Sequence, residues 1–391
     1  MFSAPSFMAA MAAVAVAINV ALPHSAPRDG VALDTSSGTA YFATIADAVA
    51  AADDGDTVRV GPGTYIEAVV IDKDITLKAD TPIEEVILRA PEDGPMAIIS
   101  GQGRDTRRDA TELPYAIRLV GVDATVSGLT IEGRRSAIIA EGGSPLLEGL
   151  RLVKVGWPLA GSGDELKGIH LFASDAHVRD NTLIGGGNIQ AVGDGNLRVE
   201  DNVLLGGPTI AGSFGEKGVI RGNEIRDPSY EGIQIEDGGA ASVEDNILSG
   251  IPRTGILLGW TDATDTVASV RRNHIDGALV GIQLIPGVTA EVLENEVSGA
   301  SIALLVNDSN GIVSGNRFVG NPVGIAIRSG APSLEGNTVM DASTALQLSG
   351  TAAPRLTGNT ICGTEVSIML IDGAELPDTA GNDVCETLAT N

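Results

Sequence analysis

The chain has 391 residues, and its hydrophobic share of 43% excludes an intrinsically disordered protein. Its formal net charge of −26 argues against nucleic acid as a partner, because phosphate binding needs a basic surface. A polyanionic substrate would, for the same reason, need a local basic patch that offsets the general charge.

The first predicted element is an export signal in residues 1–26. The stretch from Phe7 to Leu22 is apolar, and the small residue Ala26 is suited to precede a cleavage point. The stretch is short and alanine-rich for a membrane span, although it lacks the usual preceding Lys or Arg. No other segment is apolar and long enough to cross a bilayer. We therefore expect a periplasmic or secreted protein whose domain comprises residues 27–391.

The next predicted element is an amphipathic helix near residues 45–52. It is followed by the turn DDGD, the strand TVRV and the turn GPGTY. The first coil of a repetitive β structure would otherwise expose unpaired backbone groups. A helix lying across that coil prevents end-to-end pairing, so we interpret this segment as an N-terminal cap.

The rest of the chain repeats an asparagine at intervals of 21 to 27 residues, in surroundings such as VEDNVL and LEGNTV. A period of this size predicts a stack of coils. Leucine-rich repeats share the period, but they need a regular leucine frame with one strand per repeat. Here each repeat holds two or three alternating runs rich in Ile and Val, which predicts an all-β, right-handed parallel β-helix of about a dozen coils. The repeated asparagines are Asn181, Asn202, Asn223, Asn246, Asn273, Asn295, Asn316, Asn337, Asn359 and Asn382.

The asparagine is expected at a sharp corner between two strands. One residue there must adopt a left-handed backbone conformation, which asparagine tolerates well. At a coil spacing of ~4.8 Å, successive amides can hydrogen-bond as a ladder. Leu129 and Leu150 occupy the same position in earlier coils.

Two cysteines, Cys362 and Cys385, are 23 residues apart, which is one coil. Equivalent positions on adjacent coils lie within bridging distance, so we predict a disulfide that closes the last turn. Two thiols without a nearby histidine do not indicate a metal site.

The N-terminal segment and the coils resemble the pectin lyase-like β-helix superfamily, including its NosD-type and carbohydrate-binding, sugar-hydrolysis repeat proteins. The resemblance extends from about residue 38 to residue 385. It implies the fold, but the superfamily includes lyases, hydrolases, esterases, epimerases and non-enzymes. It also implies that a site lies on the outer face of the strand that carries the recurring Gly-Ile pair. Polar residues on that face concentrate between Arg118 and Glu236.

The first candidate cluster centres on His170, the histidine predicted to face outward on this strand. Glu141 is expected one coil below at ~5 Å, with Lys167 beside it and Gln190 above. Such a group is suited to acid–base catalysis.

Residues for substrate binding are expected around this cluster. Arg118 and Arg107 are suited to hold a uronate carboxylate. Trp157 and Trp260 fall on over-long loops, where a tryptophan either stacks on sugar or packs the loop down.

The alternative cluster is Glu231, Gln234 and Glu236, whose carboxylates are suited to cleave a glycosidic bond or to bind Ca²⁺. It lies three coils, or ~14 Å, from His170. The neighbouring coils lack the additional Asp pair and His-Gly of polygalacturonases, and Ser229 and Tyr230 replace the His and Asp of the epimerase pattern D-P-H-D. The W-x-D-H signature of pectate lyases is also missing.

Three hypotheses follow from these patterns. The first is an exported polysaccharide lyase, C5-epimerase or glycoside hydrolase, and the second is a non-catalytic glycan- or surface-binding β-helix. The third, a NosD-like periplasmic accessory protein, is disfavoured by the low content of copper ligands: two Cys, six Met and four His. We expect a monomer that engages polysaccharide between Arg118 and Glu236, without nucleic acid and with no cofactor other than Ca²⁺.

Overall fold

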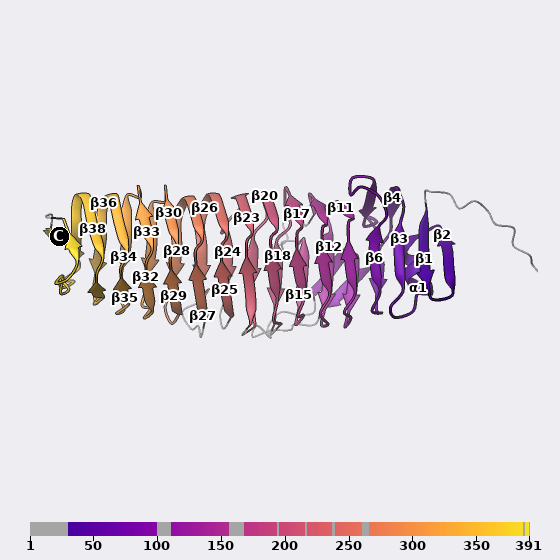
Figure 1. The fold of residues 1–391 in the computed structure, drawn as a ribbon, viewed down its shortest axis with the longest axis horizontal. Coiled ribbons are helices and arrows are strands. Elements are labelled where there is room, and N and C mark those ends of the chain that lie inside the picture. Colours follow the sequence, from indigo (N-terminus) through magenta and orange to yellow (C-terminus); the bar gives the residue numbers. More distant parts are fainter. Residues whose placement is uncertain are drawn as a thin grey trace, which may run out of the picture.

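The structure is a computed structural model that describes residues 30–99, 111–155, 168–193, 195–215, 217–236, 239–259, 266–385 and 388–390. These residues form an elongated stack of about 13 parallel β coils (Figure 1). The predicted all-β solenoid is therefore confirmed. Among the described residues, no helix is long and apolar enough to span a membrane.

Each coil contains three strand segments. The strands that lead to the asparagine form one sheet, which we call the approach sheet. It contains, in spatial order, β2 (Gly38–Phe42), β1 (Val31–Thr35), β3 (Thr57–Val60), β6 (Thr76–Ala79), β10 (Thr125–Ser127), β13 (Leu146–Glu148), β16 (His177–Arg179), β19 (Arg198–Glu200), β22 (Gly218–Arg221), β25 (Ala240–Glu244), β27 (Val267–Arg271), β29 (Thr289–Leu293), β32 (Ile312–Ser314), β35 (Ser333–Glu335) and β37 (Arg355–Thr357).

The strands that follow the asparagine position, here called exit strands, stack in the same way. They are β4 (Gly63–Ile66), β7 (Val86–Arg89), β11 (Thr130–Glu132), β14 (Arg151–Val153), β17 (Thr182–Ile184), β20 (Val203–Gly207), β23 (Glu224–Pro228), β30 (Glu296–Ser298), β33 (Arg317–Val319) and β39 (Asp383–Val384).

The third stack contains the strands with the Gly-Ile pair and their equivalents, here called G-I strands. They are β5 (Val69–Ile71), β9 (Thr111–Val120), β12 (Ser136–Glu141), β15 (Ile169–Phe172), β18 (Ile189–Val192), β21 (Ile210–Gly212), β24 (Ile233–Ile235), β31 (Ile302–Val306), β34 (Val323–Ile327) and β40 (Leu388–Thr390).

Four long strands contain an exit segment and a G-I segment in one run, so the two stacks join into one bent sheet. They are β26 (Ile247–Leu258), β28 (His274–Leu284), β36 (Thr338–Ser349) and β38 (Thr360–Ile371). A further strand, β8 (Met96–Ile99), pairs antiparallel with the start of β9 and was not predicted from the sequence.

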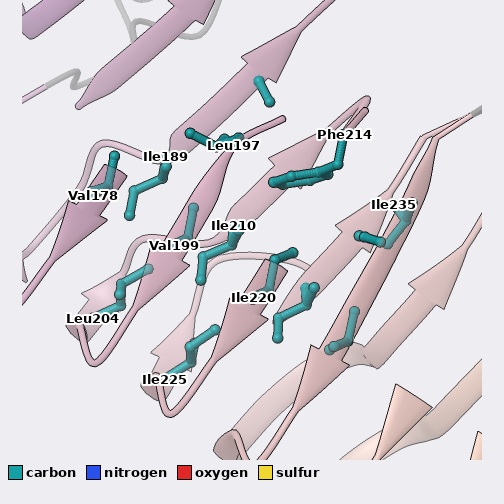
Figure 2. Close-up of a cluster of buried hydrophobic side chains, with 14 of the residues drawn as sticks. Val178, Ile189, Leu197, Val199, Leu204, Ile210, Phe214, Ile220, Ile225 and Ile235 are labelled. Carbon is teal, nitrogen blue, oxygen red and sulfur yellow. The ribbon is translucent and has the colours of Figure 1, made fainter. Parts of the chain in front are cut away.

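The interior of the stack is filled by columns of similar side chains. Val178, Val199, Ile220 and Val243 lie in register on consecutive approach strands, and each is fully buried. Figure 2 shows three of these residues with the isoleucines of the facing strands. β-Branched side chains suit this pleated, closely spaced surface. Every second residue of a strand is thereby fixed inside, and the residues between them point outward.

The predicted asparagine ladder is confirmed. Nδ2 of each asparagine from Asn181 to Asn359 donates to Oδ1 of the next, at 2.8–2.9 Å. The same oxygen also accepts the backbone N–H of the preceding asparagine, as between Asn202 and Asn223 at 3.1 Å. At the start of the ladder, the backbone N–H of Leu150 donates to Asn181 Oδ1 at 2.8 Å.

The expected backbone conformation of the asparagine is wrong. The left-handed residue is the one before it, as at Asp180, Asp201 and Asp245, where φ is 55° to 56°. This arrangement has a physical reason: the preceding residue makes the sharp turn, so the asparagine needs no positive φ and directs its amide along the stack. Asp and Gly, which tolerate positive φ, recur at this preceding position.

The N-terminal cap is confirmed as α1 (Ile45–Ala51). Glu67 of the first coil accepts hydrogen bonds from the backbone N–H groups of Ile45 and Ala46 at 3.0 and 2.8 Å. At the other end, Lys73 Nζ donates to the carbonyl of Ala50 at 2.9 Å. Both charges complement the helix dipole. The antiparallel hairpin β1–β2 adds a second element to this end, which the sequence did not predict.

The C-terminal end is closed by the predicted disulfide. Cys362 and Cys385 are bonded across adjacent coils, with Cα atoms 4.9 Å apart. The division into a signal at residues 1–26 and a domain at 27–391 stays a prediction, because the described chain begins at residue 30.

Replacing Asn246 with alanine should destabilise the protein by about 1–3 kcal/mol. The change removes the acceptor of Asn223 Nδ2 and the donors to Asn273 Oδ1 and to the Ile220 carbonyl, all buried. Thermal or denaturant unfolding measures the loss. Ser301→Ala, at an exposed position, is the control and should change stability by less than ~0.5 kcal/mol. Equal stability of the two variants would contradict a structural role for the ladder.

The ionised Asp34 side chain should stabilise the folded protein at pH values above 3.8, the ordinary pKa of an aspartate, and should not do so in strong acid. Hydrogen bonds from Arg59 and then Thr39 lower the pKa of Asp34 from 3.8 to about 2. The folded state therefore favours the ionised form, and this contribution is lost as pH falls from 3.8 towards about 2. Asp34→Asn should be less stable than the wild type at neutral pH, and the difference should shrink over that acid range. A difference that grows on acidification would be inconsistent with this pairing.

Candidate functional site

The G-I strands align the candidate residues in one outward column. Paired in register on consecutive coils are Arg118, Ile139, His170, Gln190, Ala211 and Gln234. They alternate with residues of the hydrophobic core, such as Leu171 and Ala191. The order of the column is the one that the asparagine period predicts.

Part of this face is covered by a hydrophobic cluster of its own. Tyr115, Phe172 and Ala97 pack around Ile139, which is fully buried although it points out of the main core. Ala97 comes from β8, so the β8–β9 hairpin lies over the G-I strands here. The burial also raises the pKa of the Tyr115 phenol. The face is therefore closed at Ile139.

Glu141 lies on β12, next to the strand of His170, but its carboxylate bonds to Arg118 on β9, on the opposite side. Its register partners are Val120 and Phe172, and its carboxylate accepts two hydrogen bonds from Arg118, at 2.6 Å from Nε and 3.2 Å from Nη2. This hydrogen-bonded pair raises the pKa of Arg118. The structure thus joins the predicted binding residue Arg118 to the predicted catalytic residue Glu141.

His170 occupies a recessed position in the column. Its side chain is 8% exposed, and its ring meets Phe172 edge-to-face with centroids 5.0 Å apart. Gln190 is its register partner on the next coil.

Gln190 connects the two clusters that the sequence treats as separate. Its Nε2 donates to Glu236 Oε1 at 3.2 Å, across the intervening strand β21. The small side chain of Ala211 lies between them and leaves room for this contact. His170 and Gln190 share the outward column, whereas Glu236 lies two residues beyond the column member Gln234. The hydrogen bond links Glu236 to this column, and we call His170, Gln190 and Glu236 the polar row.

The other members of the alternative cluster are also recessed. Gln234 is 9% exposed and Glu231 is 7% exposed. Glu231 Oε1 lies 3.2 Å from Nη1 of Arg253 on the next coil. The charge of Glu231 is thereby paired.

Four candidate residues lie outside the described residues: Lys167, Trp157, Trp260 and Arg107. Their predicted roles stay predictions.

The sequence analysis missed a charge ladder on the approach sheet. Glu200 is 4% exposed, and its carboxylate lies 2.7 Å from His177 Nε2, 2.8 Å from Arg198 and 2.7 Å from Arg221. The sequence contains the pattern that would have predicted it. Two residues before each asparagine of the ladder, or before Leu150, stands a charged residue whose sign alternates from one coil to the next. In order, the residues are Glu148, Arg179, Glu200, Arg221, Glu244 and Arg271.

The described residues do not fit a copper centre. Copper sites use His, Cys and Met ligands, but Cys362 and Cys385 are consumed by the disulfide. His170 and His177 lie on different sheets, and His274 faces Glu296 on an exit strand. Within the described ranges no group of three His, Cys, Asp or Glu is arranged to hold a metal ion.

Comparisons with known proteins agree with this architecture. Residues 115–268 match the family described as right handed beta helix region, and residues 255–385 match the family described as periplasmic copper-binding protein (NosD). No curated protein sequence matches the chain.

Solved structures with a similar chain path include two carbohydrate-active enzymes. The catalytic unit of a GH87 alpha-1,3-glucanase from Streptomyces thermodiastaticus shares 15% identity, with a TM-score of 0.50, over 88% of this chain and 65% of that chain. The Azotobacter vinelandii mannuronan C-5 epimerase AlgE6 A-module shares 17% identity, with a TM-score of 0.45, over 80% of this chain and 92% of that chain. At these identities the likeness concerns the fold.

The coil architecture, the asparagine ladder and the first family match define a right-handed parallel β-helix. The fold and the two family matches fit the pectin lyase-like superfamily of such β-helices.

The Arg118–Glu141 pair should show measurable energetic coupling. A double-mutant cycle with Arg118→Met and Glu141→Gln, followed by urea unfolding, should give a coupling energy of about 1 kcal/mol. The pair is bidentate and its side chains are only 28% and 25% exposed. The matched control is Arg317 and Glu296, which are 3.5 Å apart and about half exposed, and whose coupling should be smaller. Coupling as weak as in the control would rule out a structural contribution of the pair.

Proposed function

We propose that this protein is an exported β-helix that binds polysaccharide along the outer face of the G-I strands between Arg118 and Glu236. The hydrogen bond between Gln190 and Glu236 carries the proposal, because it joins the two predicted clusters into one polar row. A row that runs along the stack presents repeated polar groups to a linear polymer. Carbohydrate-binding sites use such a small number of fixed polar groups to set orientation.

Within this row, His170 and Glu236 lie three coils apart, so one or the other is the candidate proton donor or acceptor of a lyase, C5-epimerase or glycoside hydrolase. Each of these reactions needs groups that give and take a proton at the sugar. The carboxylates of Glu141 and Glu231 pair with Arg118 and Arg253. These two pairs are better suited to position the row. A non-catalytic glycan-binding protein would use the same face without the proton transfer.

A second candidate function is a NosD-like periplasmic accessory role, which the family match over residues 255–385 favours. It is the weaker candidate, because the histidines and cysteines among the described residues do not converge. Export itself is supported by the disulfide, since such bonds persist in oxidising compartments.

The experiment is a panel of neutral and uronate-containing polysaccharides, with and without Ca²⁺, applied to the wild type and to three variants. Binding is measured by affinity electrophoresis. Turnover is followed by ultraviolet absorbance for lyase products, by reducing ends for hydrolysis and by proton NMR for epimerisation. His170→Ala and Glu236→Gln should weaken binding or turnover about tenfold or more, because they remove central members of the row.

The matched control is Gln347→Ala, because Gln347 lies on the same stack of strands far from the row. Its binding and turnover should equal those of the wild type. A folded protein that binds none of the polysaccharides, or equal losses in all three variants, would reject the proposed face.

A further inference from the structure

A small hollow lies outside the polar row, at the corner where exit strand β11 turns into G-I strand β12. Its cavity volume is about 20 Å³, which accommodates one water-sized atom, such as a single oxygen of an oxyanion. Ala116 and Val155 contribute apolar lining, whereas Glu132, Arg134, Arg135 and Ser136 contribute polar groups. We call it the corner pocket.

The hydroxyl of Ser136 is the most unusual of these groups. Ser136 is 1% exposed, and within the described part of the chain its Oγ has no hydrogen-bond partner. Burying a hydroxyl in this way is costly, and most buried polar groups are bonded. Because Ser136 lines the pocket, a bound ligand with an acceptor atom would satisfy it.

The two arginines bring positive charge that the structure does not neutralise. Arg134 is exposed and has no carboxylate partner among the described residues. The side-chain contact of Arg135 is with the sulfur of Met96, at 3.8 Å. Glu132, the acidic member of the lining, is bonded by Arg89 Nε at 2.6 Å.

Arg134 and Arg135 differ in this respect from Arg118, whose guanidinium donates both of its hydrogen bonds to Glu141. In a chain with a net charge of −26, two arginines without carboxylate partners at one hollow form a local basic site. A guanidinium binds planar or tetrahedral oxyanions through parallel N–H donors. The hydroxyl of Ser136 adds a third donor.

We propose that the corner pocket binds an oxyanion, a carboxylate or sulfate group carried by a sugar, and thereby selects acidic over neutral polysaccharide. The inference rests on the proposed glycan-binding function and adds a substrate class and a second site to it. The general negative charge of the protein repels acidic polymers, so their binding depends on this local pair of arginines.

The test compares polysaccharides that share a backbone and differ in charge: polygalacturonate with its methyl ester, and dextran sulfate with dextran. The two pairs distinguish a carboxylate from a sulfate. The protein should bind the charged member of at least one pair about tenfold or more tightly than the neutral member. Arg134→Gln combined with Arg135→Gln should abolish this preference.

The control removes the same amount of charge elsewhere. Arg328→Gln combined with Arg355→Gln changes two exposed arginines on later coils and should keep the preference. Loss of the preference in both double variants would assign it to net charge and overturn the pocket.

Ser136→Ala separates binding from folding. Because the hydroxyl has no partner, its removal should leave the melting temperature unchanged or raise it. The affinity for the charged polysaccharide should nevertheless fall by about threefold or more. A lower melting temperature with unchanged affinity would assign Ser136 a structural role and overturn its part in the site.

The failure of this inference is distinguishable from failure of the proposed function. Equal affinity for charged and neutral members would reject the pocket and leave glycan binding intact. Binding of free sulfate or galacturonate that depends on Arg134 and Arg135, without binding of any polysaccharide, would keep the anion site and reject the glycan function. Binding of neither would reject both.

Discussion

The hydrogen-bonded amide ladder is the interaction on which the rest of this structure depends. Each asparagine places both its amide and its backbone N–H in bonds to neighbouring coils, so the corner of one coil defines the height of the next. Because the side-chain period of a strand is two, a shift of one residue would exchange the inner and outer faces. The ladder therefore determines which residues of every later strand reach the outer surface.

The polar row of His170, Gln190 and Glu236 depends on the register of the G-I strands. Gln190 reaches Glu236 only because the strand between them presents the small Ala211 at the same position in the column. Ile139 interrupts the row on the other side, and the β8–β9 hairpin covers it with apolar side chains. The site is therefore bounded by packing at one end and by the change to apolar residues beyond Gln234 at the other, where Leu257 follows in register.

Periodic features of the chain were predictable, and single side-chain directions were not. The spacing of the asparagines predicted the coils, the register of His170 with Gln190 and the disulfide at the last turn. Glu141 was placed on the correct strand, but a long carboxylate can turn to either neighbouring coil, and the sequence does not say that Arg118 holds it. Likewise, the reach of Gln190 across two coils depends on side-chain length and on a vacancy at Ala211, neither of which is periodic.

The position of the left-handed residue illustrates a different limit. Asn is the conspicuous member of each corner, yet the turn is made by the residue before it, such as Asp180 or Asp201. The repeat identifies the asparagine and the residue before it as the corner. It does not say which of the two makes the left-handed turn and which makes the ladder hydrogen bonds. The positive φ angles in the structure assign the turn to the preceding residue.

The direction of the ladder has a consequence for how such a chain can change in length. From Asn181 to Asn359, every amide donates to the next asparagine on the C-terminal side, and the same Nδ2 also donates to a backbone carbonyl of the preceding coil, so the coils are joined head to tail. A whole coil can be added or lost with the ladder intact, because each new asparagine finds the same acceptor above and donor below. A single residue gained or lost within a strand has no such solution, and the tolerated sites for small insertions are the loops between strands. The length of the stack can therefore change only by whole coils, whereas the loops between strands can change by single residues.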